Sequence, residues 1–191
     1  MGWLVLLVAY LLGSIPTALL VSRKIAGVDI RMIGDGNMGA HNIKSQFGWG
    51  PAILVAVADF AKGALAVLLA KAVGLSLDWQ IAALAAAVLG HDFPVFARMR
   101  GGQGLATTLG GLTSLAFWEM VAGLVLFGLI YLITRNSNLG ASIGTGTAVL
   151  LMALDGRPRL LVIGAIAVIL MIPAKNTVDR RRREQIRARQ A

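Results

Sequence analysis

The chain has 191 residues, of which 57% are hydrophobic and only 14% charged, and its formal net charge is +9. Soluble domains average about 25% charged residues, so apolar runs that recur from end to end predict an integral membrane protein. The absence of cysteine excludes disulfides, thiol catalysis and cysteine-bound metal. Two histidines make a histidine-rich metal site unexpected as well. In a membrane protein, an excess of arginine reflects topology rather than nucleic-acid binding.

The apolar runs predict an all-α bundle of about seven transmembrane helices. The first, residues 2–21, is interrupted by Gly13-Ser-Ile-Pro16, where the proline predicts a kink. Its apolar core is too long for a cleavable signal peptide. The fourth run has thirteen residues, where about 20 are typical of a span; if it were re-entrant, five crossings would remain. The other expected spans are residues 51–72, 79–97, 118–134, 141–154 and 158–172, with the short fourth run at 105–117.

We expect one membrane domain, residues 1–174, with polar loops at 22–48, 98–104 and 135–140, followed by a basic tail at 175–191. Seven crossings place fourteen of the eighteen Lys and Arg residues on the side of these loops and the tail, and three on the opposite side. Because cytoplasmic loops carry the excess of positive charge, we expect the loops and the C-terminus in the cytoplasm and the N-terminus outside. The absence of a targeting sequence fits a bacterial inner membrane.

Two glycine-rich stretches stand beside charges, at Gly34-Asp-Gly-Asn-Met-Gly39 and Arg100-Gly-Gly-Gln-Gly104. Glycines allow close backbone approach, and bare N–H groups beside a cation suit a phosphate. The first stretch formally matches a dinucleotide-binding loop, but no strand precedes it, so a Rossmann fold is excluded. The alternative to a binding site is a plain turn between two spans.

In the second stretch, Arg100 supplies a planar guanidinium for phosphate oxygens, and the helix expected to begin at Leu105 supplies the partial positive charge of its N-terminus. The alternative is a flexible connection in which Arg100 only adds to the positive charge on the cytoplasmic side.

Several polar residues fall in or next to the spans. Asp59 and Lys62 lie three residues apart, hence on one helix face. They mark either a functional site or a structural ion pair in the bundle. His91 could act as a general base or be a hydrogen-bonded interfacial histidine. Asp35 and His41 share the first glycine stretch and could form a carboxylate–imidazole pair.

These motifs together resemble the bacterial acyl-phosphate:glycerol-3-phosphate acyltransferases, small polytopic enzymes that make lysophosphatidic acid. The resemblance runs in order over almost the whole chain, on segments that include Leu11-Leu-Gly-Ser-Ile-Pro16, Gly27-Val-Asp-Ile-Arg31, Gly34 to Asn42, Asp59-Phe-Ala-Lys-Gly63, Gly90-His-Asp-Phe-Pro-Val-Phe96, Arg100 to Gly110 and Arg135 to Ser142. The positions that keep the family pattern are Gly34, Gly36, Asn37, Gly39, Asn42, His91, Gly101, Gly102, Gly104 and Thr107.

The chain departs from the family pattern where the family's chemistry is concentrated. Asp35 stands for a serine and His41 for a threonine in the first motif, and Arg100 and Gln103 replace the two lysines of the second. The third motif reads Asn138-Leu-Gly-Ala141, with Ser142 shifted by one position. Near the C-terminus, Ala174-Lys-Asn-Thr-Val-Asp-Arg180 stands for a pattern that contains histidine, arginine and asparagine. Replacing lysine by glutamine removes a charge, and a carboxylate at position 35 opposes anion binding.

The resemblance implies acyl transfer from acyl phosphate to the 1-hydroxyl of glycerol 3-phosphate at a cytoplasmic face, without a cofactor or metal. Arg100 and the amides of 101–104 would hold the donor phosphate, and Asn37 and Asn42, with Arg31 or Lys44, the acceptor phosphate. The proton would go to the departing phosphate, His41 or Asp35. The expected substrate-binding set is Gly34, Gly36, Asn37, Gly39, Asn42, Lys62, His91, Gly101, Gly102, Gln103, Gly104 and Thr107, with Arg100, His41 and Asp35 as catalytic candidates.

Two rival functions remain open at this stage. One is a divergent paralogue that uses another acceptor or donor, and the other is a non-catalytic binder of phosphorylated lipids. The absence of an internal repeat argues against a carrier. The partners expected are acyl phosphate, glycerol 3-phosphate and membrane lipids, and not nucleic acid; the oligomeric state is not readable from the sequence.

Overall fold

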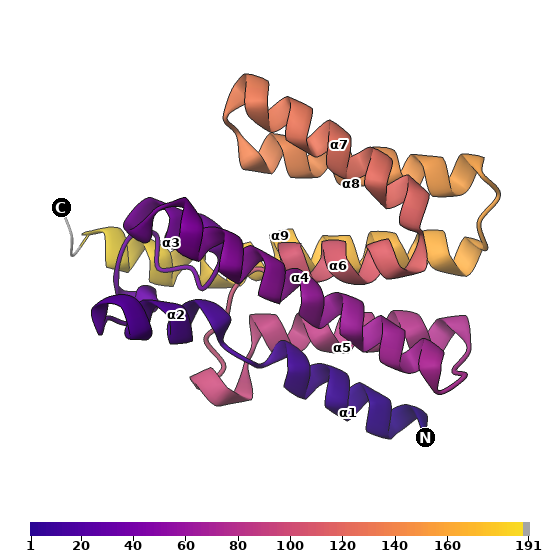
Figure 1. Ribbon diagram of the computed structural model, residues 1–191, viewed down its shortest axis with the longest axis horizontal. Helices are drawn as coiled ribbons and strands as arrows, with labels where there is room; N and C mark the ends of the chain where they lie inside the picture. The colour runs from indigo at the N-terminus through magenta and orange to yellow at the C-terminus, as the bar shows by residue number, and fades with distance from the viewer. Residues whose placement is uncertain (189–191) are drawn as a thin grey trace.

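The structure, a computed structural model, describes residues 1–188 of the chain, with all side chains in that range except those of Arg182 and Arg187. The end of the expected basic tail, residues 189–191, lies outside the described residues. Within the described range the regular structure is helical, which confirms the all-α fold (Figure 1). The elements are α1 (Gly2–Gly13), α2 (Thr17–Ala26), the 3-10 turn η1 (Ile30–Met32), α3 (Ala40–Phe47), α4 (Trp49–Ala72), α5 (Leu77–Asp92), η2 (Val95–Ala97), α6 (Leu105–Leu115), α7 (Phe117–Thr134), α8 (Ser137–Leu154) and α9 (Arg159–Ala188).

Six helical segments of the described chain are long and apolar enough to cross a membrane, which confirms an integral membrane protein. They are Gly2–Ala26, Trp49–Ala72, Leu77–Ala97, Phe117–Thr134, Ser137–Leu154 and Arg159–Arg181. The remaining expected span, the fourth run at residues 105–117, forms the short helix α6. Its 11 residues rise about 16 Å, less than the thickness of a hydrocarbon core of about 30 Å.

Helix α6 nevertheless carries the chain from one end of the bundle to the other. Its first residue follows Gly104, which packs against Asp92 at the end of α5. Near its last turn, the Ser114 carbonyl accepts a hydrogen bond of 2.5 Å from Lys71 Nζ, next to the turn between α4 and α5. The chain therefore passes between the two ends seven times, and the re-entrant alternative with five crossings is not what the structure shows.

Close helix contacts depend on small residues at the crossing points. A Cβ atom at Gly13 would collide with the Ala87 carbonyl of α5, and one at Gly63 of α4 would collide with the Thr107 carbonyl of α6. Such small residues let helix backbones approach in a membrane bundle. The same segment that ends α1 at Gly13 contains Pro16, and the expected kink appears as a break between α1 and α2.

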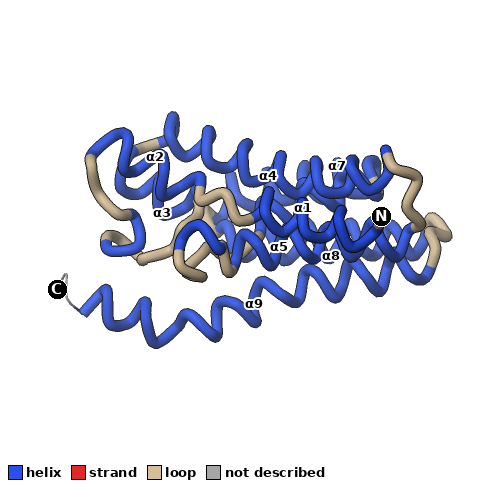
Figure 2. Tube along the Cα trace, turned by 90° about the horizontal axis from the view of Figure 1, so that it is seen from below, coloured by secondary structure: helices blue, strands red, loops and turns tan. Residues whose placement is uncertain are grey.

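The two ends of the bundle differ in what they carry. Figure 1 places the N-terminus and the loop between α8 and α9 at one end, and α2, α3 and the C-terminal end of α9 at the other. Figure 2 shows α9 running along the length of the bundle. Both glycine-rich stretches lie at the end that holds α2 and α3.

Several segments expected as loops are partly helical. The 22–48 stretch contains the end of α2, η1 and α3, and most of 135–140 belongs to α8, whose first turn is capped by Asn136 Oδ1 at 3.1 Å from the amides of Asn138 and Leu139. Helix α9 continues through Pro173 to Ala188. Prolines are tolerated inside membrane helices, and the side-chain pair Lys175–Asp179 at spacing i,i+4 supports the helix beyond it.

Candidate active site

The first glycine loop, residues 27–39, is folded around the side chain of Asn42. This side chain is buried, and its amide nitrogen donates to the carbonyls of Ile30, Ile33 and Asn37 at 3.1–3.2 Å. Its oxygen accepts from the Asp35 amide at 3.2 Å. Asn42 was expected to bind substrate; in the structure its polar atoms hold the loop.

The conformation of this loop requires glycine at two positions. Gly34 and Gly36 have φ of 60° and 70°, values that favour glycine. A Cβ atom at Gly34 would also collide with Asn42 Oδ1. Gly39 forms the extended N-cap of α3, where a Cβ atom would lie 3.1 Å from Asn37 Nδ2.

Asp35 and Asn37 of the first loop, and His41 at the start of α3, have different surroundings. Asp35 Oδ1 accepts from the Asn37 amide at 2.9 Å, which closes a tight turn. Asn37 is 7% exposed, and its Oδ1 has no hydrogen-bond partner among the described residues. His41 is exposed, and no hydrogen bond or ion pair joins it to Asp35 in the described chain. The structure thus does not form the expected carboxylate–imidazole pair, while it leaves one buried acceptor for a ligand.

An ion pair fastens the first glycine loop to the segment before the second. Arg31 binds Asp29 with contacts of 2.9 and 2.6 Å, and its Nη1 donates to the Ala97 carbonyl at 2.8 Å. The hydrogen bonds from Arg31 hold the pKa of the Asp29 carboxyl below its usual value, and Asp29 in turn raises the pKa of Arg31. Arg31 is therefore engaged within the protein rather than presented to a phosphate.

The second glycine loop, residues 100–104, doubles back on the end of α5. The amides of Gly101 and Gly102 donate to the carbonyls of Asp92 and His91, both at 3.1 Å. A Cβ atom at Gly102 would collide with His91 Nε2 and lie 2.9 Å from the Met38 carbonyl of the first loop. The two glycine loops therefore touch each other beside His91.

This loop leaves some of its donors unused. The amides of Gln103 and Gly104 donate to no backbone carbonyl of the described chain, and Gly104 precedes the first turn of α6, whose amides have no intrahelical partner. Thr107 in this turn is fully buried, and its hydroxyl has no partner among the residues described. Arg100 is exposed, and its guanidinium makes no hydrogen bond or ion pair with the rest of the described chain. The Arg100 guanidinium and the amides of Gln103 and Gly104 therefore keep hydrogen-bond donors that the described chain does not use.

Lys62, expected to bind substrate, lies in a buried charge cluster. Its Nζ contacts Asp59 Oδ1 and the Ile15 carbonyl, both at 2.6 Å, and Asp59 Oδ1 lies 3.7 Å from His91 Nδ1. Side-chain exposure in this cluster is between 4% and 8%. The Ile15 carbonyl comes from the break before α2, so the cluster joins three segments of the bundle. Lys62 is satisfied by protein atoms.

Sequence reasoning missed the residues that the last turns of α9 bring to the two loops. The Gln103 carboxamide lies 2.8 Å from Asn176 Oδ1, and the same end of the carboxamide lies 3.0 Å from Nη1 and Nη2 of Arg183. A Cβ atom at Gly36 would lie 2.6 Å from Ile186 Cδ1. The spacing of Asn176, Arg183 and Ile186 fits one face of a helix and was the signal in the sequence.

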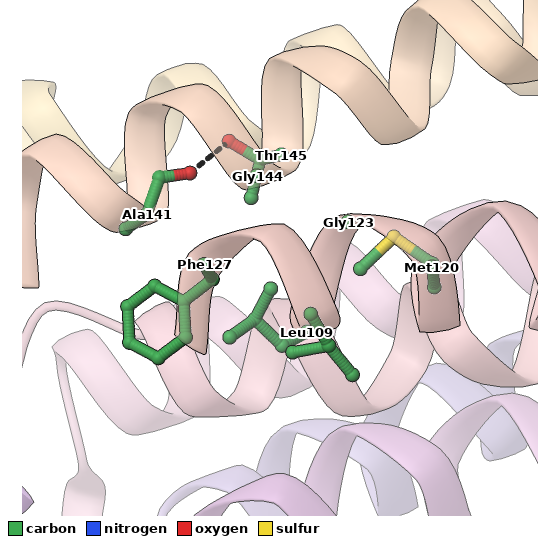
Figure 3. Close-up of a pocket in the computed structure, with 8 residues that line it drawn as sticks. Leu109, Met120, Gly123, Phe127, Ala141, Gly144 and Thr145 are labelled. Atoms are coloured by element: carbon green, nitrogen blue, oxygen red, sulfur yellow. Dashed lines mark hydrogen bonds between the residues drawn. The ribbon is translucent and has the colours of Figure 1, made fainter. Parts of the chain in front are cut away.

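A small apolar pocket opens between α6 and the α7–α8 hairpin (Figure 3). Gly123 and Gly144 let α7 and α8 approach closely there, because a Cβ atom at Gly123 would lie 2.5 Å from the Gly144 carbonyl. Its lining is Leu109, Met120, Gly123, Leu124, Phe127, Ala141, Gly144 and Thr145. The Thr145 hydroxyl donates a hydrogen bond of 2.7 Å to the Ala141 carbonyl. Because its polar group is already engaged, the lining of the pocket is apolar.

Known proteins resemble this chain over most of its length. The sequence profile described as "Glycerol-3-phosphate acyltransferase" matches residues 3–184. A protein of that name from one strain of Thermus thermophilus is 48% identical over 158 residues, covering 80% of this chain and 76% of its own. Another from Pseudomonas putida is 39% identical over 178 residues, covering 93% and 94%.

Solved structures agree with the sequence matches. One, described as PlsY (YgiH), an integral membrane glycerol 3-phosphate acyltransferase, in its glycerol 3-phosphate form, superposes with a TM-score of 0.85. It is 31% identical and covers 95% of this chain and 90% of its own. Its lysophosphatidic acid form gives a TM-score of 0.83 at the same identity and coverage. The expected resemblance is confirmed: the chain belongs to the glycerol-3-phosphate acyltransferase family.

Proposed function

We propose that this protein transfers an acyl group from acyl phosphate to the 1-hydroxyl of glycerol 3-phosphate and so makes lysophosphatidic acid. The observation that carries the proposal is the contact between the two glycine loops beside His91, where the Arg100 side chain is exposed and the amides of Gln103 and Gly104 donate to no backbone carbonyl of the described chain. Family membership, and relatives solved with glycerol 3-phosphate and lysophosphatidic acid, support it.

The acyl phosphate is the reactive partner. Its head lies against Arg100 and the amides at the start of α6, and these donors stabilise the charge that develops at the carbonyl oxygen. The hydroxyl oxygen of glycerol 3-phosphate attacks the acyl carbon, the bond from that carbon to the phosphate oxygen breaks, and inorganic phosphate leaves. The departing phosphate takes the hydroxyl proton, or receives it through His41 or Asp35. An acyl phosphate is already a mixed anhydride, so proximity and charge stabilisation suffice.

The unpartnered Asn37 oxygen suggests how the acceptor is oriented. An amide oxygen accepts hydrogen bonds, and this one is buried and unused within the described chain. It therefore suits a glycerol hydroxyl better than a phosphate. This assigns Asn37 to the alcohol end of the acceptor, while Asn42 shapes the loop around it.

The charge distribution supports a cytoplasmic active face in a bacterial inner membrane. The described basic residues of the glycine loops and of the end of α9 lie at one end of the bundle, with Arg157 and Arg159 at the other. Because positive residues accumulate on the cytoplasmic side, the N-terminus lies outside and the C-terminus inside. The acyl chain then lies between the helices, and the apolar pocket next to α6 offers a place for part of it.

A second candidate is the same transfer to a less anionic acceptor. Asp35 places a carboxylate in the first loop, and among the described residues it forms no ion pair with a basic side chain. A carboxylate disfavours a second anion nearby. An acceptor that carries hydroxyls but less negative charge would tolerate Asp35 better than glycerol 3-phosphate does.

The test is an assay of purified protein in detergent with palmitoyl phosphate and glycerol 3-phosphate, following both lysophosphatidic acid and inorganic phosphate. Product that requires both substrates supports the transferase. Phosphate without lysophosphatidic acid supports the donor site and the second candidate. Neither product from folded protein refutes catalysis and leaves a lipid-binding role.

Arg100→Ala should lower kcat by roughly 10²- to 10³-fold, as for the loss of one oxyanion donor. Arg98→Ala is the matched control, because Arg98 is also exposed in this segment and its guanidinium is without hydrogen bonds or ion pairs to the described residues; it should keep activity largely unchanged. Equal effects of the two substitutions would remove Arg100 from the site.

A further inference from the structure

The two ends of the α7–α8 hairpin are held to the rest of the bundle in different ways. At the end away from the glycine loops, Met120 and Met152 belong to an apolar core shared with α6 and α9. The buried Glu119 carboxylate there binds Arg157 with contacts of 2.5 and 3.2 Å. Beyond Gly123, no residue of α7 is buried, and Figure 1 shows the hairpin as a layer of its own. The loop end of the hairpin therefore depends on other contacts.

Lys44 of α3 supplies a polar contact at the loop end. Its Nζ donates to the Tyr131 hydroxyl of α7 at 2.7 Å. The same Nζ lies 4.0 Å from the centroid of the Trp49 ring and 5.5 Å from that of Tyr131, within the range of a cation–π attraction. Among the described residues, Lys44 is the only one outside the hairpin whose side chain hydrogen-bonds to α7 beyond Gly123. Lys44 was expected, as an alternative to Arg31, to hold the acceptor phosphate; its ammonium contacts α7 instead.

This contact connects the first glycine loop with the apolar pocket. Lys44 follows Asn42 by two residues on the same short helix, and the Asn42 side chain holds the loop. On the other side of the contact, the Tyr131 ring stacks on Phe127 with the ring centroids 6.3 Å apart. Phe127 lines the pocket between α6 and the hairpin (Figure 3). A movement of α7 at Tyr131 would therefore change both the pocket and the support of the loop.

The surroundings of the pocket suit the tail of a lipid-like donor. Leu109 of the pocket follows Leu105, the first residue of α6, by four residues, or about 6 Å along the helix. The pocket thus lies one turn beyond the proposed place of the donor's head. The loop-end half of α7 exposes Leu129, Leu132 and Ile133, so it faces hydrocarbon rather than water in a membrane. A donor dissolved in the bilayer can reach the site between α6 and this half of the hairpin.

We infer that the contact between Lys44 and Tyr131 is a latch on the hairpin, and that it controls the passage of the acyl donor between bilayer and site. The inference rests on the proposed function and deepens it, by giving the route of a single-chain acyl phosphate. When the latch is closed, a bound acyl chain is retained. When it opens, the loop end of the hairpin moves away from α6 about the other end, where Ala116 alone separates α6 from α7. Lys44 acts through Tyr131 and is a positioning residue.

The first experiment compares KM for each substrate. Lys44→Met and Tyr131→Phe each remove the hydrogen bond and keep most of the packing. A hydrogen bond to a charged group changes an equilibrium by roughly tenfold, so KM for palmitoyl phosphate should rise about tenfold in each variant. KM for glycerol 3-phosphate should stay at its wild-type value. The double variant should be no worse than either single one, because both remove the same interaction.

Lys24→Met is the matched control, since Lys24 is exposed at the same end of the bundle and forms no hydrogen bond or ion pair in the described chain. It should leave both KM values unchanged. If Lys44 instead bound the acceptor phosphate, Lys44→Met would raise KM for glycerol 3-phosphate, and Tyr131→Phe would change neither value. If the contact only stabilised the fold, the variants would unfold at lower temperature with wild-type KM values. Either result would overturn the inference.

Cross-linking tests the passage directly, because the chain has no cysteine of its own. In Lys44→Cys with Tyr131→Cys, a short reducible bis-methanethiosulfonate reagent replaces the latch by a covalent link. Linked before palmitoyl phosphate is added, the protein should lose at least tenfold in activity, and dithiothreitol should restore it. Linked after palmitoyl phosphate is added, it should release the donor at least tenfold more slowly than the unlinked pair.

The matched control for the cross-link is Lys71→Cys with Ser114→Cys. Lys71 Nζ contacts the Ser114 carbonyl at 2.5 Å, so this link joins α4 to α6 at the opposite end and leaves the hairpin free. It should keep the protein active. Full activity of the linked pair at positions 44 and 131 would overturn the inference.

Failure of the inference and failure of the proposed function are distinguishable through binding. Palmitoyl phosphate should raise the unfolding temperature of the wild type, as any ligand of the native state does. If the wild type makes no product, yet palmitoyl phosphate stabilises the unlinked cysteine pair and not the linked one, the transferase fails and the inference stands. If the wild type makes product and the linked pair binds and reacts as the unlinked pair does, only the inference fails. If palmitoyl phosphate does not stabilise the wild type, both fail.

Discussion

Substituting Lys62 by methionine tests whether the buried charge cluster is structural. The Lys62 ammonium contacts Asp59 and the Ile15 carbonyl at 2.6 Å, with side-chain exposures of 7% for Lys62 and 4% for Asp59. The substitution leaves the Asp59 carboxylate buried, with His91 at 3.7 Å beside it. Breaking a buried pair by removing one partner costs about 3–5 kcal/mol.

That cost should appear mainly as a loss of stability. At roughly 2–4 °C per kcal/mol for a chain of this size, the unfolding temperature of Lys62→Met should fall by about 6–20 °C. Replacing both charges, with Asp59→Leu and Lys62→Met, should recover most of the loss, because an apolar pair of similar volume removes the stranded carboxylate. Lys71→Met is the matched control: its ammonium contacts one carbonyl at an exposed site, so it should cost less than about 1 kcal/mol.

The assay is thermal unfolding followed by tryptophan fluorescence in detergent, together with KM for both substrates. If Lys62 instead bound substrate, Lys62→Met would raise KM at an unchanged unfolding temperature, and the double variant would stay defective. A wild-type unfolding temperature for the single variant would refute the structural role.

Three further predictions concern the loops and the helix packing. Asn42→Ala removes four hydrogen bonds of about 0.5–1.5 kcal/mol each and should lower both unfolding temperature and kcat; a change in KM alone would contradict its role in the loop. Gly63→Ala places a Cβ against a helix backbone and should cost about 1–3 kcal/mol, while Gly128→Ala, which meets no atom, should be nearly neutral in the same melting assay. Because the folded pKa of Asp29 is lowered, its ion pair contributes stability that is present above about pH 4 and lost as the pH falls through the folded pKa. The difference in unfolding temperature between the wild type and Asp29→Asn should therefore shrink below about pH 4, and a difference that persists there would contradict the ion pair.

The sequence predicted those features that depend on local composition. Apolar runs located the spans, and Pro16 located the break in the first, because hydropathy and the missing N–H act within a few residues. The glycine loops were predictable because a run of glycines beside charged residues is also visible within a few residues. Helix α6 was recognisable as short, but its passage between the two ends depends on contacts with α4 and α5 that no local pattern contains.

The roles of individual site residues were less predictable. Asn42 and Arg31 have the chemistry of ligand-binding residues, yet their polar atoms face the protein. Arg183 was assigned to topology because it belongs to a run of arginines, and its contact with Gln103 joins distant parts of the chain. Which way a polar side chain turns is decided by long-range packing, so residue type alone predicts the class of a site better than its members.

The substituted residues of the two glycine motifs differ in what α9 places beside them. An anion responds to the total potential at its position, and a guanidinium contributes the same charge from a helix as a lysine does from a loop. At the second loop, α9 contacts Gln103, the residue that stands where the family pattern has a lysine. At the first loop, α9 contributes Ile186, which is apolar, and in the described chain no cation pairs with the Asp35 carboxylate. The two departures from the family pattern therefore differ in their surroundings: Gln103 lies against a side chain of α9, while Asp35 places a carboxylate in the first loop with no cation paired to it in the described chain.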